Sequence, residues 1–164
     1  MRRSTIALST VCLLLVASSA SALEPPRLIP RSQRIDRPIE QVFTTLKTYF
    51  SDPALSMFNL KSAERVSGTI VATRHGIDGG TWSRWAACTT SPEQMLDQLE
   101  DGAVTVTIKL EPSGNRATFI SATADFRGTY GLGSSSTIIE CVSKGGLEQS
   151  LIAVATGAQS QATP

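Results

Sequence analysis

A short apolar strand that turns directly into an amphipathic helix, residues 137–155, constrains the fold of this chain more than any other stretch. Its first six residues are mostly β-branched and favour a strand, and apolar residues then recur at helical spacing from Leu147 to Val154. Cys141 lies at the end of the strand, and Ser143 is placed as the helix N-cap. We therefore expect the rest of the domain to pack against this strand-to-helix corner.

Two glycines, Gly145 and Gly146, stand near the start of this helix. Glycine near a helix N-terminus lets the backbone come close either to a ligand anion or to a neighbouring strand. Because Cys141 precedes the two glycines, we expect close packing against the strand that carries Cys88.

The N-terminus has the three parts of a secretory signal peptide. Residues 1–3 are basic, an apolar run covers residues 11–17, and an A-x-A cleavage box ends at Ala22. The alternative is an uncleaved membrane anchor, but this run is too short to cross about 30 Å of hydrocarbon. We expect cleavage after Ala22. The mature chain would then be exported, either periplasmic or secreted, with no transmembrane segment.

Removal of residues 1–22 leaves a nearly neutral chain whose two cysteines are Cys88 and Cys141. A nucleic-acid binder normally carries a basic surplus, so we do not expect nucleic acid as a partner. In an oxidising compartment, two cysteines predict one disulfide, with two separate buried thiols as the alternative. We expect no metal site, because His75 is the one histidine that could join the sulfurs.

The N-terminal half of the mature chain alternates between extended and helical patterns. After an extended segment at 23–27, we expect an edge strand at 28–35 and a helix at 38–50 with Asp36 as its N-cap. Residues 54–62 are expected to form a loop or a short helical turn. Two strands, 66–74 and 81–88, would then form a hairpin turned by residues 78–80.

The C-terminal half begins with a helix at 91–102, which has a Ser-Pro start and a glycine stop. Residues 103–126 alternate between apolar and polar residues and predict two strands joined by a turn at 112–115. A glycine-rich loop at 128–136 then leads to the closing strand and helix. One domain would thus cover residues 28–155, and residues 156–164 would form a disordered tail.

In order, these elements are β-α-β-β-α-β-β-β-α, which predicts an α+β domain with helices packed on one face of an antiparallel sheet. This order, with its helices at 38–50 and 143–155, resembles the helix-grip superfamily. That superfamily includes START and Bet v 1-like domains and the helix-grip domains of an outer-membrane assembly lipoprotein. The resemblance implies a curved sheet that grips a helix, with an apolar pocket between them.

No catalytic motif is present in the chain. His75 lies next to a glycine near an expected hairpin tip, no G-x-S-x-G sequence occurs, and both mature cysteines are assigned to the disulfide. Asp125 and Glu140 could form a general acid/base pair if they faced one cavity. An edge position, or a salt bridge to Arg84, Arg116 or Arg127, is the simpler interpretation. We therefore expect a non-enzymatic protein that needs no cofactor.

The candidate site residues fall into an aromatic set and a polar set. Small residues at 122–124 leave room above the sheet for a helix or a ligand. The aromatic candidates for an apolar ligand are Trp82, Trp85, Phe126 and Tyr130. The polar candidates are His75, Asp125, Arg127 and Glu140.

These features predict an exported binding module for an apolar small molecule or lipid, or for a protein of the cell envelope. The alternative is a purely structural or protein-interaction domain without a ligand cavity. A third hypothesis is a small hydrolase or cyclase that uses Asp125 or Glu140.

Overall fold

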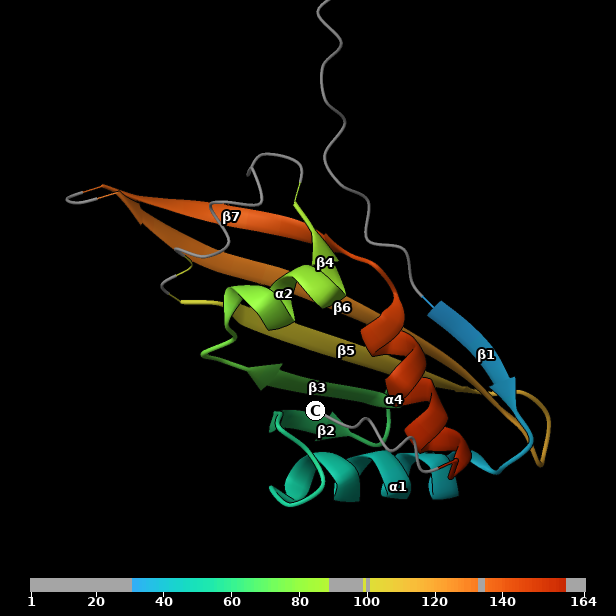
Figure 1. Cartoon of the computed structure of the whole chain (residues 1–164). Helices are drawn as coiled ribbons and strands as arrows, with labels where there is room; N and C mark the ends of the chain where they lie inside the picture. Colours follow the sequence, from blue (N-terminus) through green and yellow to red (C-terminus); the bar gives the residue numbers. More distant parts are fainter. Residues whose placement is uncertain (1–30, 89–98, 100, 133–134, 159–164) are drawn as a thin grey trace, which may run out of the picture.

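One antiparallel sheet of seven strands forms the framework of the part of the chain that the structure describes (Figure 1). This computed structural model describes residues 31–88, 99, 101–132 and 135–158. The strand order is β2-β3-β5-β6-β7-β4, and β1 also pairs with β6. The strands are β1 (Arg31–Ile35), β2 (Asn59–Glu64), β3 (Thr69–Arg74), β4 (Ala86–Ala87), β5 (Ala103–Pro112), β6 (Thr118–Leu132) and β7 (Ser135–Ser143).

The long strand β6 joins the two halves of the sheet. One of its edges pairs with β5. Its other edge pairs first with β1, where Ala122 faces Arg31, and then with β7, where Phe126 faces Cys141. Because β1 and β7 share this edge, the start of β1 comes close to the corner where β7 leads into the last helix (Figure 1).

Among the described residues, three helices cover one face of this sheet (Figure 1): α1 (Ile39–Ser51), α2 (Gly79–Trp85) and α4 (Gly146–Thr156). The apolar stripe of α1 is buried, including Val42 and Leu46 at 0% exposure. The predicted α+β class is confirmed, with an antiparallel sheet and helices on one face. The predicted element order is also confirmed, with the two-residue strand β4 as an addition.

The two faces of β5 and β6 follow the predicted alternation. On β5, Val104, Val106 and Ile108 are fully buried beneath the helices. The side chains between them, such as Thr105 and Thr107, are half-exposed on the opposite face. The apolar period of two therefore fixes which face of the sheet forms the core.

The prediction of a strand at 81–88 is wrong, because this segment is mostly helix α2. Asp78 is the N-cap of α2, and its carboxylate accepts hydrogen bonds from the backbone N–H and the hydroxyl of Thr81, both at 2.8 Å. Residues 78–80 therefore start a helix instead of turning a hairpin. The hairpin is formed by β2 and β3, so the loop expected at 54–62 becomes a strand from Asn59 onward.

Two predicted helix caps also differ. Helix α1 has Pro38 as its N-cap, while Asp36 pairs with Arg34 at 3.0 Å. Helix α4 has Gly145 as its N-cap, with a φ of 86° that favours glycine. Ser143 lies two residues earlier, where its hydroxyl accepts a hydrogen bond from the Gly145 N–H at 3.0 Å.

The glycine-rich loop expected at 128–136 is instead largely strand. β6 continues to Leu132 and β7 begins at Ser135, with Gly128 paired to Ile139. The helix expected at 91–102 falls mostly outside the described residues. Residues 1–30, with the expected signal peptide, and 159–164 of the expected tail also lie outside them. In the described ranges, no helix is both long and apolar enough to span a bilayer.

Candidate functional site

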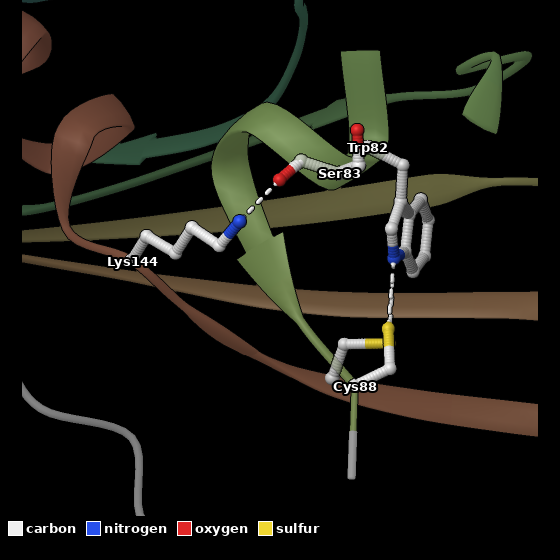
Figure 2. The surroundings of a disulfide bond; sticks show 5 residues. Trp82, Ser83, Cys88 and Lys144 are labelled. Atoms are coloured by element: carbon white, nitrogen blue, oxygen red, sulfur yellow. Dashed lines mark hydrogen bonds between the residues drawn. A yellow bond between two sulfur atoms is a disulfide. The ribbon is translucent and has the colours of Figure 1, made fainter. Parts of the chain in front are cut away.

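The predicted disulfide between Cys88 and Cys141 is present, with a Cα–Cα distance of 4.4 Å. It joins the segment after β4 to strand β7. The indole N–H of Trp82 points at this bond (Figure 2) and lies 3.3 Å from each of the two sulfurs. Helix α2 therefore reaches the disulfide through one buried side chain.

Trp82 is a core residue and has no exposed surface. Its ring meets that of Phe126 edge to face, with centroids 5.5 Å apart. Two glycines let the indole lie close to the backbone. A Cβ atom on Gly102 would stand 3.1 Å from Trp82 Cε3, and one on Gly128 would stand 3.4 Å from Cη2. The structure therefore gives Trp82 and Phe126 a packing role on the helix-covered face.

Trp85 lies at the margin of this core and is half-buried. The guanidinium of Arg74 lies over its ring, 5.4 Å from the centroid. The backbone carbonyl of Trp85 accepts a hydrogen bond from the Lys144 N–H at 2.7 Å, and the Lys144 ammonium donates to the carbonyl of Ser83 (Figure 2). These contacts fasten the end of α2 to the residue that follows β7. The side chain of Tyr130 lies outside the described part of the structure.

Three of the four polar candidates lie together on the face of the sheet that carries no helix. Arg127 Nε is 3.1 Å from Asp125 Oδ2, and Arg127 Nη2 is 3.8 Å from Glu140 Oε1. The salt bridge expected as the simpler interpretation is therefore present. Both acids are at least a third exposed, so they form a surface ion-pair cluster outside any enclosed cavity. His75 is exposed in the connection between β3 and α2.

The room expected above the small residues of β6 is occupied by protein. Ala122 and Ala124 are at most 1% exposed, and α4 packs against β6 on this side. The hollows lined by described residues lie at the surface and open to solvent. One of them, of about 640 Å³, runs along α1 beside the end of β2, away from Trp82, Trp85 and Phe126. Trp82, Trp85 and Phe126 thus line none of these hollows.

Metal binding finds no support in the described residues, which contain no group of three or more His, Cys, Asp or Glu side chains suited to a metal ion.

The face of the sheet that lies opposite the helices, which we call the open face, was not predicted as a functional surface. In the described part of the chain it carries no covering element (Figure 1). Phe119 is 42% exposed on it and Ile138 is 72% exposed. Its residues on β5, β6 and β7 include Thr105, Thr107, Lys109, Phe119, Ser121, Thr123, Asp125, Arg127, Ile138 and Glu140. The alternation of apolar and polar residues along β5 and β6 was the feature of the sequence that indicated this face.

A second feature missed by the sequence analysis is the corner between β1 and α4. The guanidinium of Arg31 lies against Gly145, while the neighbouring Lys144 donates its backbone N–H to Trp85, on the segment that leads to Cys88. A Cβ atom on Gly145 would stand 2.8 Å from Arg31 Cζ. Behind it, Glu148 is 1% exposed and accepts a hydrogen bond from the Ser143 hydroxyl at 2.7 Å.

No family model matches this sequence, and no curated protein matches it. Three solved structures are similar in part. A TBP-like protein from Parabacteroides distasonis is 10% identical, with a TM-score of 0.33 over 69% of this chain and 65% of that one. A DUF4468 family protein from Bacteroides ovatus is 12% identical, with a TM-score of 0.36 over 68% and 59%. The di-domain ARO/CYC BexL from the BE-7585A biosynthetic pathway is 14% identical, with a TM-score of 0.30 over 62% and 36%.

This chain therefore spans less than two thirds of the length of each of these proteins. The TM-scores are too low to assign the chain to any of their families. Membership of the helix-grip superfamily remains a prediction.

Proposed function

We propose that this chain is an exported, non-enzymatic domain that binds another protein of the cell envelope through the open face of its sheet. The observation that carries the proposal is the asymmetry of the sheet. One face is filled by helices, whereas the other exposes Phe119 and Ile138 among short polar side chains. Phe119 lies near the start of β6 and Ile138 faces Thr129, ten residues further along that strand, so the two apolar side chains mark the two ends of the proposed interaction surface.

A protein partner fits this surface better than a lipid or an apolar small molecule does. A carrier needs space between its helices and its sheet, yet Trp82, Ala122 and Ala124 are covered there. An apolar ligand in that place would have to displace close-packed side chains.

The open face combines apolar anchors with neutralised charges, which is the composition of a protein interface. Phe119 and Ile138 supply the anchors. Arg127 pairs with both Asp125 and Glu140, so this part of the face carries no basic surplus for anionic lipid or nucleic acid. The same pairs support a non-enzymatic role, because Arg127 engages both candidate acids.

Export is supported by the disulfide and by the signal-like N-terminus. A disulfide persists in oxidising compartments and is rare in the cytosol of mesophiles.

Site-specific photo-crosslinking in the source cells tests the proposed function. A photoreactive residue at Ser121, on the open face between Ser32 of β1 and Lys109 of β5, is expected to give one discrete protein adduct. The same residue at Gln41, exposed on α1, is expected to give none. Phe119→Ser and Ile138→Ser should each reduce the adduct by about tenfold, since apolar anchors dominate binding energy. Leu55→Ser, which alters an apolar side chain that is 56% exposed outside this face, should leave the adduct unchanged.

Native mass spectrometry of the protein purified from its source compartment separates the two kinds of partner. We expect the mass of the bare mature chain. A co-purifying apolar molecule, together with equal crosslinking from Ser121 and Gln41, would overturn the proposal in favour of a small-molecule carrier.

A further inference from the structure

Arg31 carries a charge for which the described part of the chain provides no partner. It begins β1, and its side chain points to the helix side of the sheet, because Arg31 faces Ala122 in the ladder. Its Nε is buried without a hydrogen-bond acceptor, and no carboxylate of the described residues lies within 4.0 Å of its guanidinium. A buried donor without an acceptor is unfavourable, so this guanidinium is poorly satisfied.

Arg31 also lies beside a second source of positive potential, the N-terminus of α4. Its guanidinium lies against Gly145, the N-cap of the eleven-residue helix α4. The N-terminus of a helix carries partial positive charge, so a cation beside it is disfavoured unless an anion is close. Glu148 in the first turn offsets part of this charge, but its Oε2 accepts from Ser143 and its Oε1 has no hydrogen-bond partner.

A hollow of about 270 Å³ opens beside the guanidinium. Its walls come from β1 and α4, which lie side by side (Figure 1). Besides Arg31, the hollow is lined by the polar residues Ser32, Gln33 and Gln149 and by the buried Ile152. Apart from Arg31 these polar groups are neutral and can donate hydrogen bonds, and no acidic side chain lines the hollow.

We propose that Arg31, with Gln33 and Gln149, binds an oxyanion in this hollow, either a carboxylate or a phosphate group. A guanidinium presents several N–H donors in one plane and matches both groups with paired hydrogen bonds. The amides of Gln33 and Gln149 add neutral donors from two rigid elements. This site is separate from the open face, because Arg31 and Gln33 belong to the helix side of the sheet. Its test is therefore independent of the proposed protein partner.

The test is a titration of the ¹⁵N-labelled mature chain followed by NMR. Inorganic phosphate and acetate are added in separate experiments, at ionic strength held constant with chloride. We expect at least one of them to shift the amide signals of Gly145 and Gly146 and the Arg31 Nε–H along a saturable curve. Saturation by phosphate alone would assign a phosphate group as the ligand, and saturation by acetate as well would assign a carboxylate.

Two variants and one control make the result specific. Arg31→Gln should weaken binding by about tenfold or more, because it removes the charged donor. Arg34→Gln is the matched control and should leave the curve unchanged, since Arg34 lies on the same strand but pairs with Asp36. Gln149→Glu alters an exposed helix residue, so it should leave the fold intact while its carboxylate repels the anion.

If both anions gave only linear shifts, or if Gln149→Glu titrated like the wild type, the proposal would be wrong. An Arg31→Gln variant that fails to fold does not affect this conclusion, because Gln149→Glu tests the same site on its own.

Discussion

Trp82 connects the disulfide to the hydrophobic core through a single side chain. Its N–H reaches both sulfurs, its ring meets Phe126, and Gly102 and Gly128 leave space for its two sides. If this fully buried ring were removed, the neighbouring side chains could not move far enough to fill its space. Residues around it are already close-packed, so its removal would leave a cavity.

We therefore predict that Trp82→Ala lowers the free energy of unfolding by about 3–5 kcal/mol, the usual cost of truncating a buried tryptophan. Trp85→Ala is the matched control three residues later and should cost about 1 kcal/mol, chiefly from its contact with Arg74. Urea unfolding followed by circular dichroism measures both values. Equal losses in the two variants would contradict the core position of Trp82.

Asp78 provides a second prediction, because its pKa is coupled to the start of α2. The backbone N–H of Thr81, and then its hydroxyl, hold the pKa of this carboxyl below its ordinary value. A carboxyl whose pKa is lowered by folding stabilises the protein above its unfolded pKa of about 3.9. That contribution is lost as the pH falls through the lower pKa of the folded state.

Asp78→Ala should therefore be less stable than the wild type at neutral pH, and the difference should shrink as the pH falls below about 4. Asp78→Asn is the control, because an amide can cap the helix but does not titrate. Urea midpoints measured at several pH values give the comparison. A difference between Asp78→Ala and the wild type that stays constant down to about pH 2.5 would show that the carboxylate does not stabilise α2.

At the scale of elements, the helices and strands that were predicted correctly are those with a long and regular pattern of apolar residues. The apolar period of two in β5 and the helical period of α1 are each set by many residues, so single errors do not change them. The face of β6 that carries Ala122 and Ala124 was also predicted, although whether a helix or a ligand would cover these small side chains stayed open. The structure places α4 there.

Helix α2 was not predicted because it has seven residues, several of them of types common in strands. Its conformation is set by the cap at Asp78 and by the burial of Trp82 against residues distant in the sequence, such as Phe126 and Gly128. The glycine-rich stretch at 128–136 was predicted as a loop for a related reason. Gly128 is needed in a strand so that Leu99 and Trp82 can approach it, and composition alone does not show this.

The candidate site was predicted less well than the fold, for a physical reason. Aromatic residues are equally expected in a core and in a pocket, and Trp82 and Phe126 proved to be core. The contact between Arg31 and Gly145 joins the two ends of the domain, so no local pattern reveals it. The ion pairs of Arg127 were predictable, because Asp125 lies two residues away on the same strand face.

At the scale of the whole molecule, the sheet has two unequal faces and one covalent link. In the described residues, the helices and the apolar face of the sheet form one hydrophobic core. The side chains of the open face do not contribute to this core. Substitutions on the open face should therefore change binding far more than they change stability. The disulfide acts at the opposite side of the sheet, where it joins the segment after β4 to the corner at the end of β7.

This arrangement predicts how the disulfide contributes to stability. It joins residues 53 positions apart, and closing such a loop in the unfolded chain is worth about 4 kcal/mol by chain entropy. The double variant Cys88→Ala/Cys141→Ala should lose about 2–5 kcal/mol of unfolding free energy, because it opens this loop and also removes the sulfurs that Trp82 contacts. Helix α2 should still form, since the Asp78 cap and the Lys144 hydrogen bonds do not depend on the sulfurs.

Urea unfolding of the mature chain measures this loss, and the reduced wild type is the matched control. Reduction opens the same loop but keeps both sulfurs near the indole N–H, so the reduced protein should be no less stable than the double variant. If the double variant unfolded at the same urea concentration as the oxidised wild type, the disulfide would not constrain this fold. We expect the disulfide variants to lose unfolding free energy and the substitutions on the open face to lose none. That result would show that the disulfide stabilises the fold, whereas the open face is available for binding.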